Sequence, residues 1–139
     1  KLTTQLETTR DQCLKMLYVL DRAHLLLLLS DKIKDYKHLT NPKKIYLNNS
    51  NLMYSLSPSN TSEGNKRETF FANQLNNISN VVIPKKGDFL VDDKFLFEVG
   101  GNSKTFDQIS NIPNSYLAIA DLETGSGNRV PLWMFGLLY

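Results

Sequence analysis

An aspartate and a glutamate stand ten residues apart in the stretch GDFLVDDKFLFEVGG, residues 87–101. Each carboxylate lies at the outer end of a short apolar run, and the DDK step between the runs predicts a hairpin turn at residues 92–94. Because a hairpin brings the ends of its strands together, we expect Asp88 and Glu98 to meet on one face. Two carboxylates in contact repel unless a proton or a cation lies between them. Paired carboxylate oxygens are ligands that Mg²⁺ uses in proteins, so this stretch is a candidate magnesium site.

Few other residues suggest chemistry. His24 and His38 have no metal-ligand spacing to each other or to Cys13, which argues against a zinc site. The glycines of SNTSEGNK and GSGNR are not followed by the Gly-Lys-Ser/Thr ending of a P-loop, so ATP binding cannot be located in this sequence. Glu68 lies near the expected start of a helix, where the helix dipole alone favours a carboxylate.

Composition limits the class of protein. The 139 residues have enough apolar content for a core, and the run LLLLL at residues 25–29 is too short to cross a membrane. One cysteine excludes an internal disulfide framework, and no secretory signal pattern opens the chain. We therefore expect a reducing, cytoplasmic setting without a membrane partner. The chain begins at Lys1 without a methionine, which leads us to expect a piece of a longer protein.

Charge is divided unevenly along the chain, although the net charge is only +2. Residues 1–49 hold nine Lys and Arg against five Asp and Glu, whereas residues 50–139 hold seven against nine. A basic front half is compatible with nucleic acid binding, and the alternative is an ordinary solvated surface of lysines.

The front of the chain is predicted to form helices followed by strands. Thr9-Arg-Asp-Gln12 fits a capping box, which predicts a helix over residues 10–22. This helix carries an apolar stripe that predicts packing against a core, with Cys13 as a small buried residue rather than a nucleophile. The stripe consists of Cys13, Leu14, Met16, Leu17, Tyr18 and Leu20. Residues 23–29 and 44–47 are predicted strands, separated by the polar segment DKIKDYKHLTNP.

That order of elements is typical of a winged helix-turn-helix, with residues 1–8 as the end of an earlier helix. Helix 10–22 would then face a DNA groove through Arg10, Gln12 and Lys15, and residues 32–44 would form the wing. Three polar side chains are few for base reading, and winged helices also bind proteins, so a protein partner is the alternative.

Residues 48–66 are rich in Asn and Ser, which predicts a connection with at most one helical turn at 52–56. We therefore expect two small domains, residues 1–60 and 61–139. The second is predicted as mixed α/β, with helices at 67–76 and 103–110 and strands at 81–84, 88–91, 95–99 and 116–121. Phe71, Leu75 and Ile78 form the apolar stripe of its first helix. Residues 130–139 are expected to pack onto the sheet, and a partner-binding tail is the alternative.

The residues around Asp88 and Glu98 carry a resemblance to a known family. The two carboxylates, between a helix bearing Glu68 and a following helix, resemble the PD-(D/E)xK nuclease-like core of restriction-type endonucleases. Over nearly its whole length the chain resembles the C-terminal part of AAA-type ATPases of bacteria and archaea, which carry a domain of that fold. The matching segments, in order, are TRDQCLKMLYVLDRAHLL, KIYLNNSNLMYSL, KRETFFANQL, GDFLVDDKFLFEVGG and VPLWMFGLLY.

The resemblance implies an α/β fold, in which a small winged-helix-like N-terminal part precedes a restriction-endonuclease-like mixed sheet flanked by helices. It makes Asp88 and Glu98 the Mg²⁺-binding carboxylates, with Glu68 as a third ligand. It also places ATP binding in an upstream ATPase domain, which would be a partner of this region.

The family's lysine, two positions after the glutamate, would orient or activate the attacking water, but Gly100 stands there. Lys104 could substitute from the start of the following helix, which makes Asp88, Glu98 and Lys104 the candidate catalytic residues. The alternative is a flexible turn at residues 100–102 with Lys104 as a surface residue. Without a local cation, negative charge that develops on a phosphate has one partner fewer.

Three functions follow as hypotheses. The first is a non-catalytic accessory region of an ATPase that binds DNA or a protein partner, with a degenerate nuclease-like domain. The second is a Mg²⁺-dependent DNA endonuclease of the PD-(D/E)xK type. The third is a structural module for self-association. The first two differ in whether Asp88, Glu98 and Lys104 converge on one accessible spot.

Overall fold

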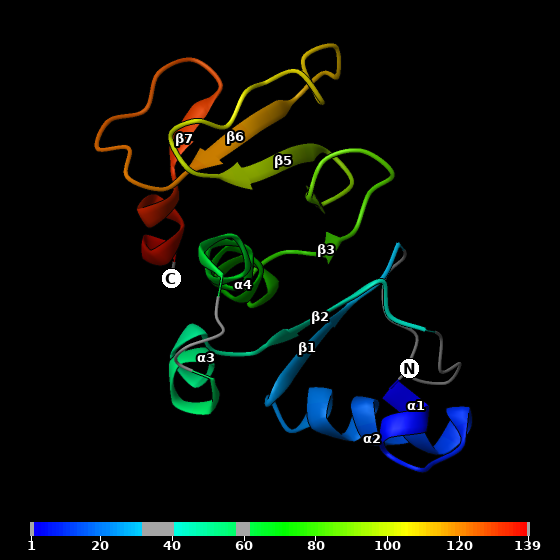
Figure 1. The fold of residues 1–139 in the computed structure, drawn as a ribbon. Coiled ribbons are helices and arrows are strands. Elements are labelled where there is room, and N and C mark those ends of the chain that lie inside the picture. Colours follow the sequence, from blue (N-terminus) through cyan, green and yellow to red (C-terminus); the bar gives the residue numbers. More distant parts are fainter. Residues whose placement is uncertain (1, 32–40, 58–61, 139) are drawn as a thin grey trace.

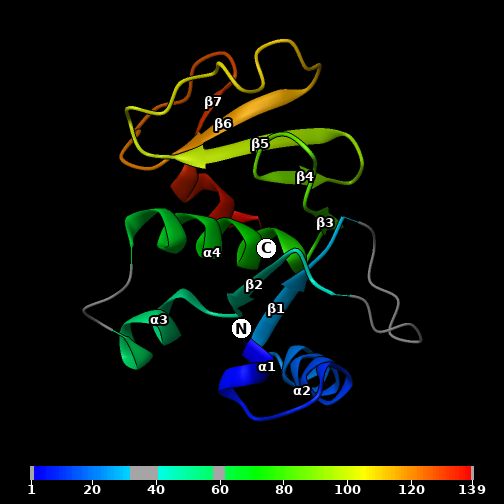
Figure 2. The same cartoon turned by 45° about the vertical axis from the view of Figure 1, so that its right-hand side comes forward.

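The chain is described from a computed structural model, which covers residues 2–31, 41–57 and 62–138. It has a mixed α/β architecture with a two-stranded sheet, a five-stranded sheet and helices. Helix α4 (Glu63–Asn76) lies between the two sheets (Figures 1 and 2). Among the described residues, no helix is both long and apolar enough to span a bilayer.

The predicted capping box and helix near the start of the chain are confirmed. Helix α2 (Arg10–Arg22) follows a short helix α1 (Leu2–Gln5), and the side chains of Thr9 and Gln12 cap its first turn. Cys13 is buried as predicted, and so are Leu14 and Tyr18. Met16 is exposed, so its place in the predicted buried stripe was wrong.

A short antiparallel hairpin follows α2. Strand β1 (Leu26–Leu29) pairs with β2 (Lys44–Leu47), and Leu28 lies opposite Ile45. Strand β1 is shorter than the predicted strand 23–29, because the chain reverses at His24, which has a φ of 55°. The larger part of the predicted wing, residues 32–40, lies outside the described residues.

Two helices follow the hairpin. Helix α3 (Ser50–Leu56) is longer than the single turn predicted for the connection. Helix α4 begins at Glu63, capped by the Ser62 hydroxyl, four residues before its predicted start. Glu68 therefore lies in the second turn, and the prediction that the helix dipole explains this carboxylate was wrong. Phe71 and Leu75 are buried on α4, whereas Ile78 lies beyond its end and is exposed.

The five strands of the larger sheet are adjacent in chain order (Figure 1). They are β3 (Val81–Val82), β4 (Phe89–Val91), β5 (Phe95–Gly100), β6 (Ser115–Ile119) and β7 (Arg129–Pro131). The pairs β3–β4 and β4–β5 are antiparallel, and the pairs β5–β6 and β6–β7 are parallel. The hairpin turn predicted at residues 92–94 is confirmed, with positive φ at Asp92 and Asp93.

Residues 101–114 form successive turns, so the helix predicted at 103–110 was wrong. Polar side chains bond locally here, as when the Thr105 hydroxyl donates to Asp107, and such bonds compete with the helical backbone pattern. The segment is nevertheless held against the sheet. Ile109 is fully buried in a small cluster with Leu96 and Leu117.

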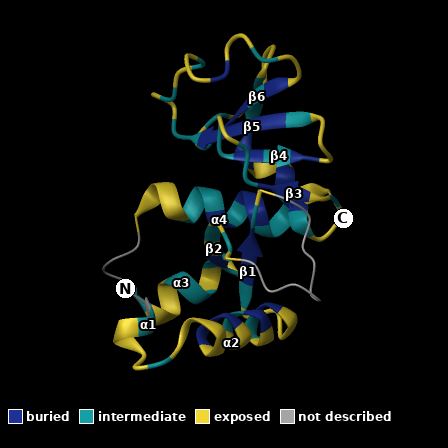
Figure 3. Cartoon of the chain, turned by 90° about the vertical axis from the view of Figure 1, so that its right-hand side faces the viewer, coloured by how far each residue is buried: buried dark blue, intermediate teal, exposed yellow. Residues whose placement is uncertain are grey.

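One large hydrophobic cluster joins the front and back of the chain. Leu27, Leu29 and Tyr46 from the hairpin pack in the same cluster as Phe71 of α4 and Phe97 of β5. Buried residues accordingly concentrate where α4 meets the strands (Figure 3). Residues on both sides of the connection near residue 60 therefore contribute to one core.

The C-terminal segment forms β7 and the 3-10 helix η1 (Leu132–Leu137). Leu132 and Phe135 are buried against the core, as predicted for an end that packs onto the sheet. Trp133 and Leu137 point outward and are exposed.

Candidate functional site

Asp88 directly precedes β4 and lies beside residues 97–99 of β5. Phe89 pairs with Phe97, and the backbone N–H of Asp88 donates to the Phe97 carbonyl at 2.9 Å. Glu98 follows Phe97 on β5 and repels Asp88 electrostatically. The two carboxylates therefore lie near each other at the open end of the β4–β5 hairpin.

Glu98 is a buried carboxylate with an uneven environment. The whole residue is only 2% exposed, although it lies in the middle of β5 among apolar residues. Its Oε1 lies 2.6 Å from the Nζ of Lys104. Its Oε2 is buried and has no hydrogen-bond partner among the residues that the structure describes. Buried carboxylate oxygens are normally satisfied, so Oε2 of Glu98 is an unusual, unsatisfied acceptor.

Lys104 reaches Glu98 by crossing over Gly100. A Cβ atom built on Gly100 would lie 2.8 Å from both Cβ and Cγ of Lys104, which is closer than non-bonded carbon atoms approach each other. The glycine at the position of the family lysine is thus what leaves space for the stem of Lys104. Lys104 is not an isolated surface lysine, because its ammonium is paired with a buried charge.

Burial and the neighbouring carboxylates shift the pKa of Lys104 in opposite directions. Burial alone would lower the pKa of Lys104, since it disfavours the charged form. The hydrogen bond to Glu98 and the attraction of Glu98, Asp88 and Glu68 outweigh this effect, and the pKa of Lys104 is raised. The ammonium is therefore charged at neutral pH. Asp88 and Glu68 also attract it, although its direct partner is Glu98.

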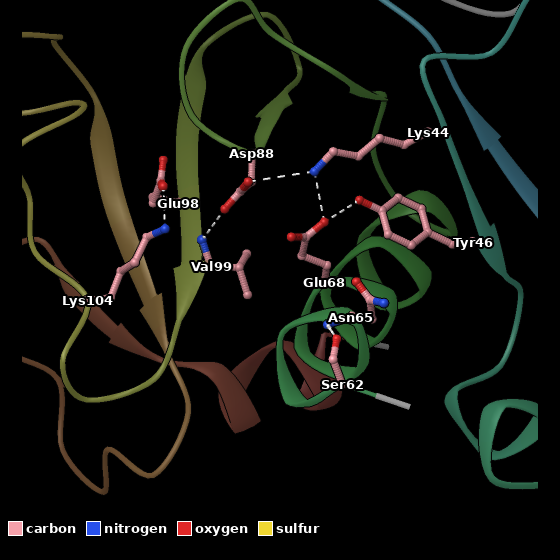
Figure 4. A network of polar contacts seen from close by, with 9 residues as sticks. All are labelled: Lys44, Tyr46, Ser62, Asn65, Glu68, Asp88, Glu98, Val99 and Lys104. Carbon is pink, nitrogen blue, oxygen red and sulfur yellow. Dashed lines mark hydrogen bonds and ion pairs between the residues drawn. The ribbon is translucent and has the colours of Figure 1, made fainter. Parts of the chain in front are cut away.

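Asp88 is held from two sides. Its Oδ2 accepts the backbone N–H of Val99 at 2.9 Å, and its Oδ1 lies 3.7 Å from the Nζ of Lys44 (Figure 4). Burial raises the pKa of Asp88; the Val99 N–H opposes this shift, and repulsion by Glu98 and Glu68 adds to it. The raised pKa means that Asp88 loses its proton less readily than an aspartate in water.

Lys44 and Tyr46, which the sequence did not suggest, complete the site from strand β2. The Nζ of Lys44 lies 2.8 Å from Oε2 of Glu68, and the Tyr46 hydroxyl donates to the same oxygen at 2.6 Å (Figure 4). Burial and the nearby Glu68 raise the pKa of Tyr46, so its hydroxyl keeps its proton. Residues two apart on a strand share a face, which was the only available signal. Nothing in the sequence names Glu68 as their target.

The predicted magnesium ligands are only partly assembled. Among the described residues, no three His, Cys, Asp or Glu side chains lie together so that they could hold a metal ion. Asp88 and Glu98 nevertheless repel each other electrostatically, and Oε2 of Glu98 is buried and has no hydrogen-bond partner among the described residues. Mg²⁺ often binds through one or two carboxylates and keeps several waters. The residues therefore fit such an ion through Asp88 and Glu98, while Glu68 is bound to Lys44 and Tyr46.

The predicted nucleic-acid residues lie at the start of α2, away from the carboxylates. Arg10 and Lys15 are exposed there. Gln12 has another role, because its Oε1 accepts from the Thr9 backbone N–H and from the hydroxyls of Thr8 and Thr9. Its carbonyl oxygen is thus used in capping α2.

Comparison of the chain with protein-family models, with curated proteins and with solved structures finds no match.

Proposed function

We propose that the chain is the C-terminal accessory region of an AAA-type ATPase, a cytoplasmic DNA-binding module that retains a nuclease-like domain in its second part. The observation that carries this proposal is that Lys44 of the same chain pairs with both Glu68 and Asp88. This internal lysine neutralises charges that a metal-dependent nuclease would leave for its metal. The choice of family is based on the resemblance of the sequence to the C-terminal part of AAA-type ATPases.

Two structural features support a nuclease-like second part. Helix α4, which bears Glu68, precedes a mixed sheet whose β4–β5 hairpin carries Asp88 and Glu98. This order of helix, hairpin and parallel strand agrees with the resemblance. The turns at residues 101–114 replace the expected second helix, and Lys104 enters the site from their beginning.

Support for DNA binding comes from the front of the chain. Helix α2 is followed by the antiparallel β1–β2 hairpin, the order expected of a winged helix. The basic residues Arg10 and Lys15 are exposed on α2, and Lys43 is exposed immediately before β2. Such cations bind phosphates and position a protein on a duplex without reading its sequence.

The test is DNA binding at two ionic strengths. The affinity is expected to fall at least about tenfold between about 50 and 200 mM salt, as for a protein that makes two or more phosphate contacts. Arg10→Ala and Lys15→Ala should weaken binding, whereas Lys94→Ala, which removes a positive charge from the β4–β5 turn, should not. Absence of DNA binding by the unmodified chain would contradict the proposal and leave protein contacts or self-association.

A second candidate function, a metal-dependent DNA nuclease, is favoured by the pairing of Lys104 with Glu98. A lysine ammonium beside a carboxylate pair is suited to stabilise negative charge that develops on a phosphate. Asp88 and Glu98 would hold Mg²⁺, which when bound would supply Lewis-acid activation of water. Glu98 would also position Lys104, since their contact at 2.6 Å fixes the ammonium.

Cleavage of plasmid and linear DNA with Mg²⁺ or Mn²⁺ separates the two candidates. If the chain is a nuclease, Glu98→Gln and Lys104→Ala should each abolish cleavage, and Lys94→Ala should leave it intact. If the chain only binds DNA, the unmodified chain should not cleave at any metal concentration. Activity that survives in both Glu98→Gln and Lys104→Ala would indicate a contaminating enzyme.

A further inference from the structure

Lys44 reaches the carboxylates from outside the part of the chain that carries them. It lies on β2, and its Nζ is 2.8 Å from Glu68 and 3.7 Å from Asp88. The ammonium thus joins a carboxylate on α4 to one beside β4, as Figure 4 shows. It also lies 5.6 Å from the centre of the Phe89 ring, which favours a cation at this place.

The oxygens around Lys44 are already in use. Oε2 of Glu68 accepts from both Lys44 and Tyr46, and Oδ2 of Asp88 accepts from the Val99 backbone. Oδ1 of Asp88 faces the ammonium. Of the carboxylate oxygens at the site, Oε2 of Glu98 is buried and has no hydrogen-bond partner among the described residues.

A divalent cation and the Lys44 ammonium would compete for this position. A magnesium ion binds carboxylate oxygens at about 2.0–2.1 Å, closer than any hydrogen-bonded ammonium. An ion on Asp88 would therefore lie within a few ångströms of Lys44, at a distance where like charges repel strongly in a partly buried site. The carboxylates can satisfy one of the two cations fully, but not both.

We propose that Lys44 is an internal competitor of divalent metal, so that metal binds Asp88 and its neighbouring carboxylates tightly only when Lys44 leaves them. The proposal rests on the second candidate function, in which Asp88 and Glu98 bind a divalent metal. It makes the β1–β2 hairpin part of the metal site, because that hairpin carries the competing charge. Lys44 thereby determines which cation the carboxylates hold.

Calorimetric titration with Mn²⁺ tests the competition directly on the chain itself. Lys44→Met keeps much of the apolar stem but removes the ammonium, and it should bind Mn²⁺ about tenfold or more tightly than the unmodified chain. Lys43→Met is the matched control, because Lys43 is the neighbouring residue and its exposed side chain pairs only loosely with Asp31 at 3.9 Å. It should change the affinity by less than about twofold.

Thermal unfolding gives a second readout that does not depend on activity. Lys44→Met should unfold at a lower temperature without metal, since Glu68 and Asp88 then repel, and Mn²⁺ should raise its melting temperature more than that of the unmodified chain. Lys44→Gln offers the same comparison with a hydrogen-bond donor retained. If both variants stay unfolded even at saturating Mn²⁺, the proposal is overturned, because the metal cannot replace the lysine.

The outcomes separate this inference from the function on which it rests. Equal Mn²⁺ affinity of the unmodified chain and Lys44→Met would overturn the competition but leave the metal site intact. No Mn²⁺ binding by either protein would remove the metal site and the competition together. Neither result bears on salt-dependent DNA binding through α2, which is measured separately.

Discussion

Glu98 dominates the chemistry of this protein at the scale of single residues. The residue is 2% exposed; one of its carboxylate oxygens is paired with Lys104, and the other has no hydrogen-bond partner in the part of the chain that the structure describes. A buried charge is tolerated only when a partner compensates its lost hydration. Stability and function should therefore both respond to changes at these two residues.

Lys104→Met should lower the free energy of unfolding by about 2 to 3 kcal/mol, because it leaves the buried Glu98 carboxylate without a cation. The stem of the side chain stays, so the loss reports the charge rather than packing. Urea denaturation of the variant and of the unmodified chain measures it. Lys86→Met, at an exposed lysine, should change the stability by less than about 0.5 kcal/mol.

A double-mutant cycle checks that the two residues act together. In the Glu98→Gln background, Lys104→Met should cost clearly less than it does alone, because the amide carries no charge to compensate. An equal cost in both backgrounds would contradict the pairing and attribute the effect of Lys104 to its contacts with Gly100.

Asp88 should make the stability depend on pH. Its pKa is raised in the folded chain, so the folded state keeps the proton at pH values where the unfolded chain has lost it. The stabilising contribution of Asp88 is therefore full below the ordinary pKa of aspartate, about 3.9, and is lost as the pH rises through the folded pKa. Urea denaturation between about pH 3 and 7 should show that the unmodified chain loses stability relative to Asp88→Asn as the pH rises. An unmodified chain that gains stability relative to Asp88→Asn as the pH rises would contradict this.

Alternation and a tight turn are local signals, so Asp88 and Glu98 can be predicted as candidate site residues from the sequence. Lys44 and Tyr46 cannot be predicted in this way. These two residues meet Glu68 across 22 to 24 residues of chain, and that approach depends on how the hairpin packs on α4. Lys104 was named as a substitute for the absent lysine. Its contact over Gly100 depends on the turns of residues 101–114, within which the sequence predicts a helix at 103–110.

At the scale of secondary structure, the β4–β5 hairpin depends on the turn at residues 92–94, in which two residues have a positive φ. Asp92 and Asp93 have φ values of 51° and 53°, in the left-handed region that glycine adopts at least cost. The two positions differ in one respect. Oδ1 of Asp92 also accepts the backbone N–H of Asn80 at 2.8 Å, which ties the turn to the residue that precedes β3.

Asp93→Gly should raise the free energy of unfolding by about 0.5 kcal/mol, because it relieves the positive φ without breaking the bond to Asn80. Asp92→Gly is the matched control at the adjacent residue, and it should not stabilise, since it removes that bond. Thermal and urea unfolding of both variants provide the measurement. Stabilisation by Asp92→Gly that equals or exceeds that by Asp93→Gly would contradict the explanation.

The elements with strong local signals were predicted well, and those without were not. Helix α2 has a capping box, and β2 has its predicted bounds of residues 44–47. The segment 103–110 has an amphipathic pattern that a helix would also show, but it folds as turns that bury Ile109 beneath the sheet. Tertiary burial overrides weak helix propensity in such segments.

At the scale of the whole molecule, one hydrophobic cluster connects the N-terminal hairpin to the larger sheet. Leu29 of β1 and Phe97 of β5 belong to it, with Phe71 of α4 between the two sheets. The two-domain prediction is based on the polar connection near residue 60, and composition reports the surface of such a connection. It does not report what the flanking elements bury.

The shared cluster predicts a single cooperative unfolding transition. Cys13 is buried in the N-terminal part and should react with a thiol reagent only on unfolding, while Trp133 fluorescence reports the C-terminal end. Both signals should change at the same urea concentration. Leu29→Ala should shift both midpoints together, at a cost of about 2 to 4 kcal/mol. Separate midpoints would contradict the shared core and support two independent units.

The position of Asp88 also bears on how the chain finds its fold. A slip of one residue between β4 and β5 would turn Asp88 and Leu90 toward α4, and Phe89 and Val91 toward the opposite face. Asp88 would then be buried against Phe71 without the Val99 N–H or Lys44 that now hold it. Such an unpaired charge is costly enough to make the misaligned hairpin short-lived. The position of Asp88 therefore also disfavours the wrong strand alignment during folding.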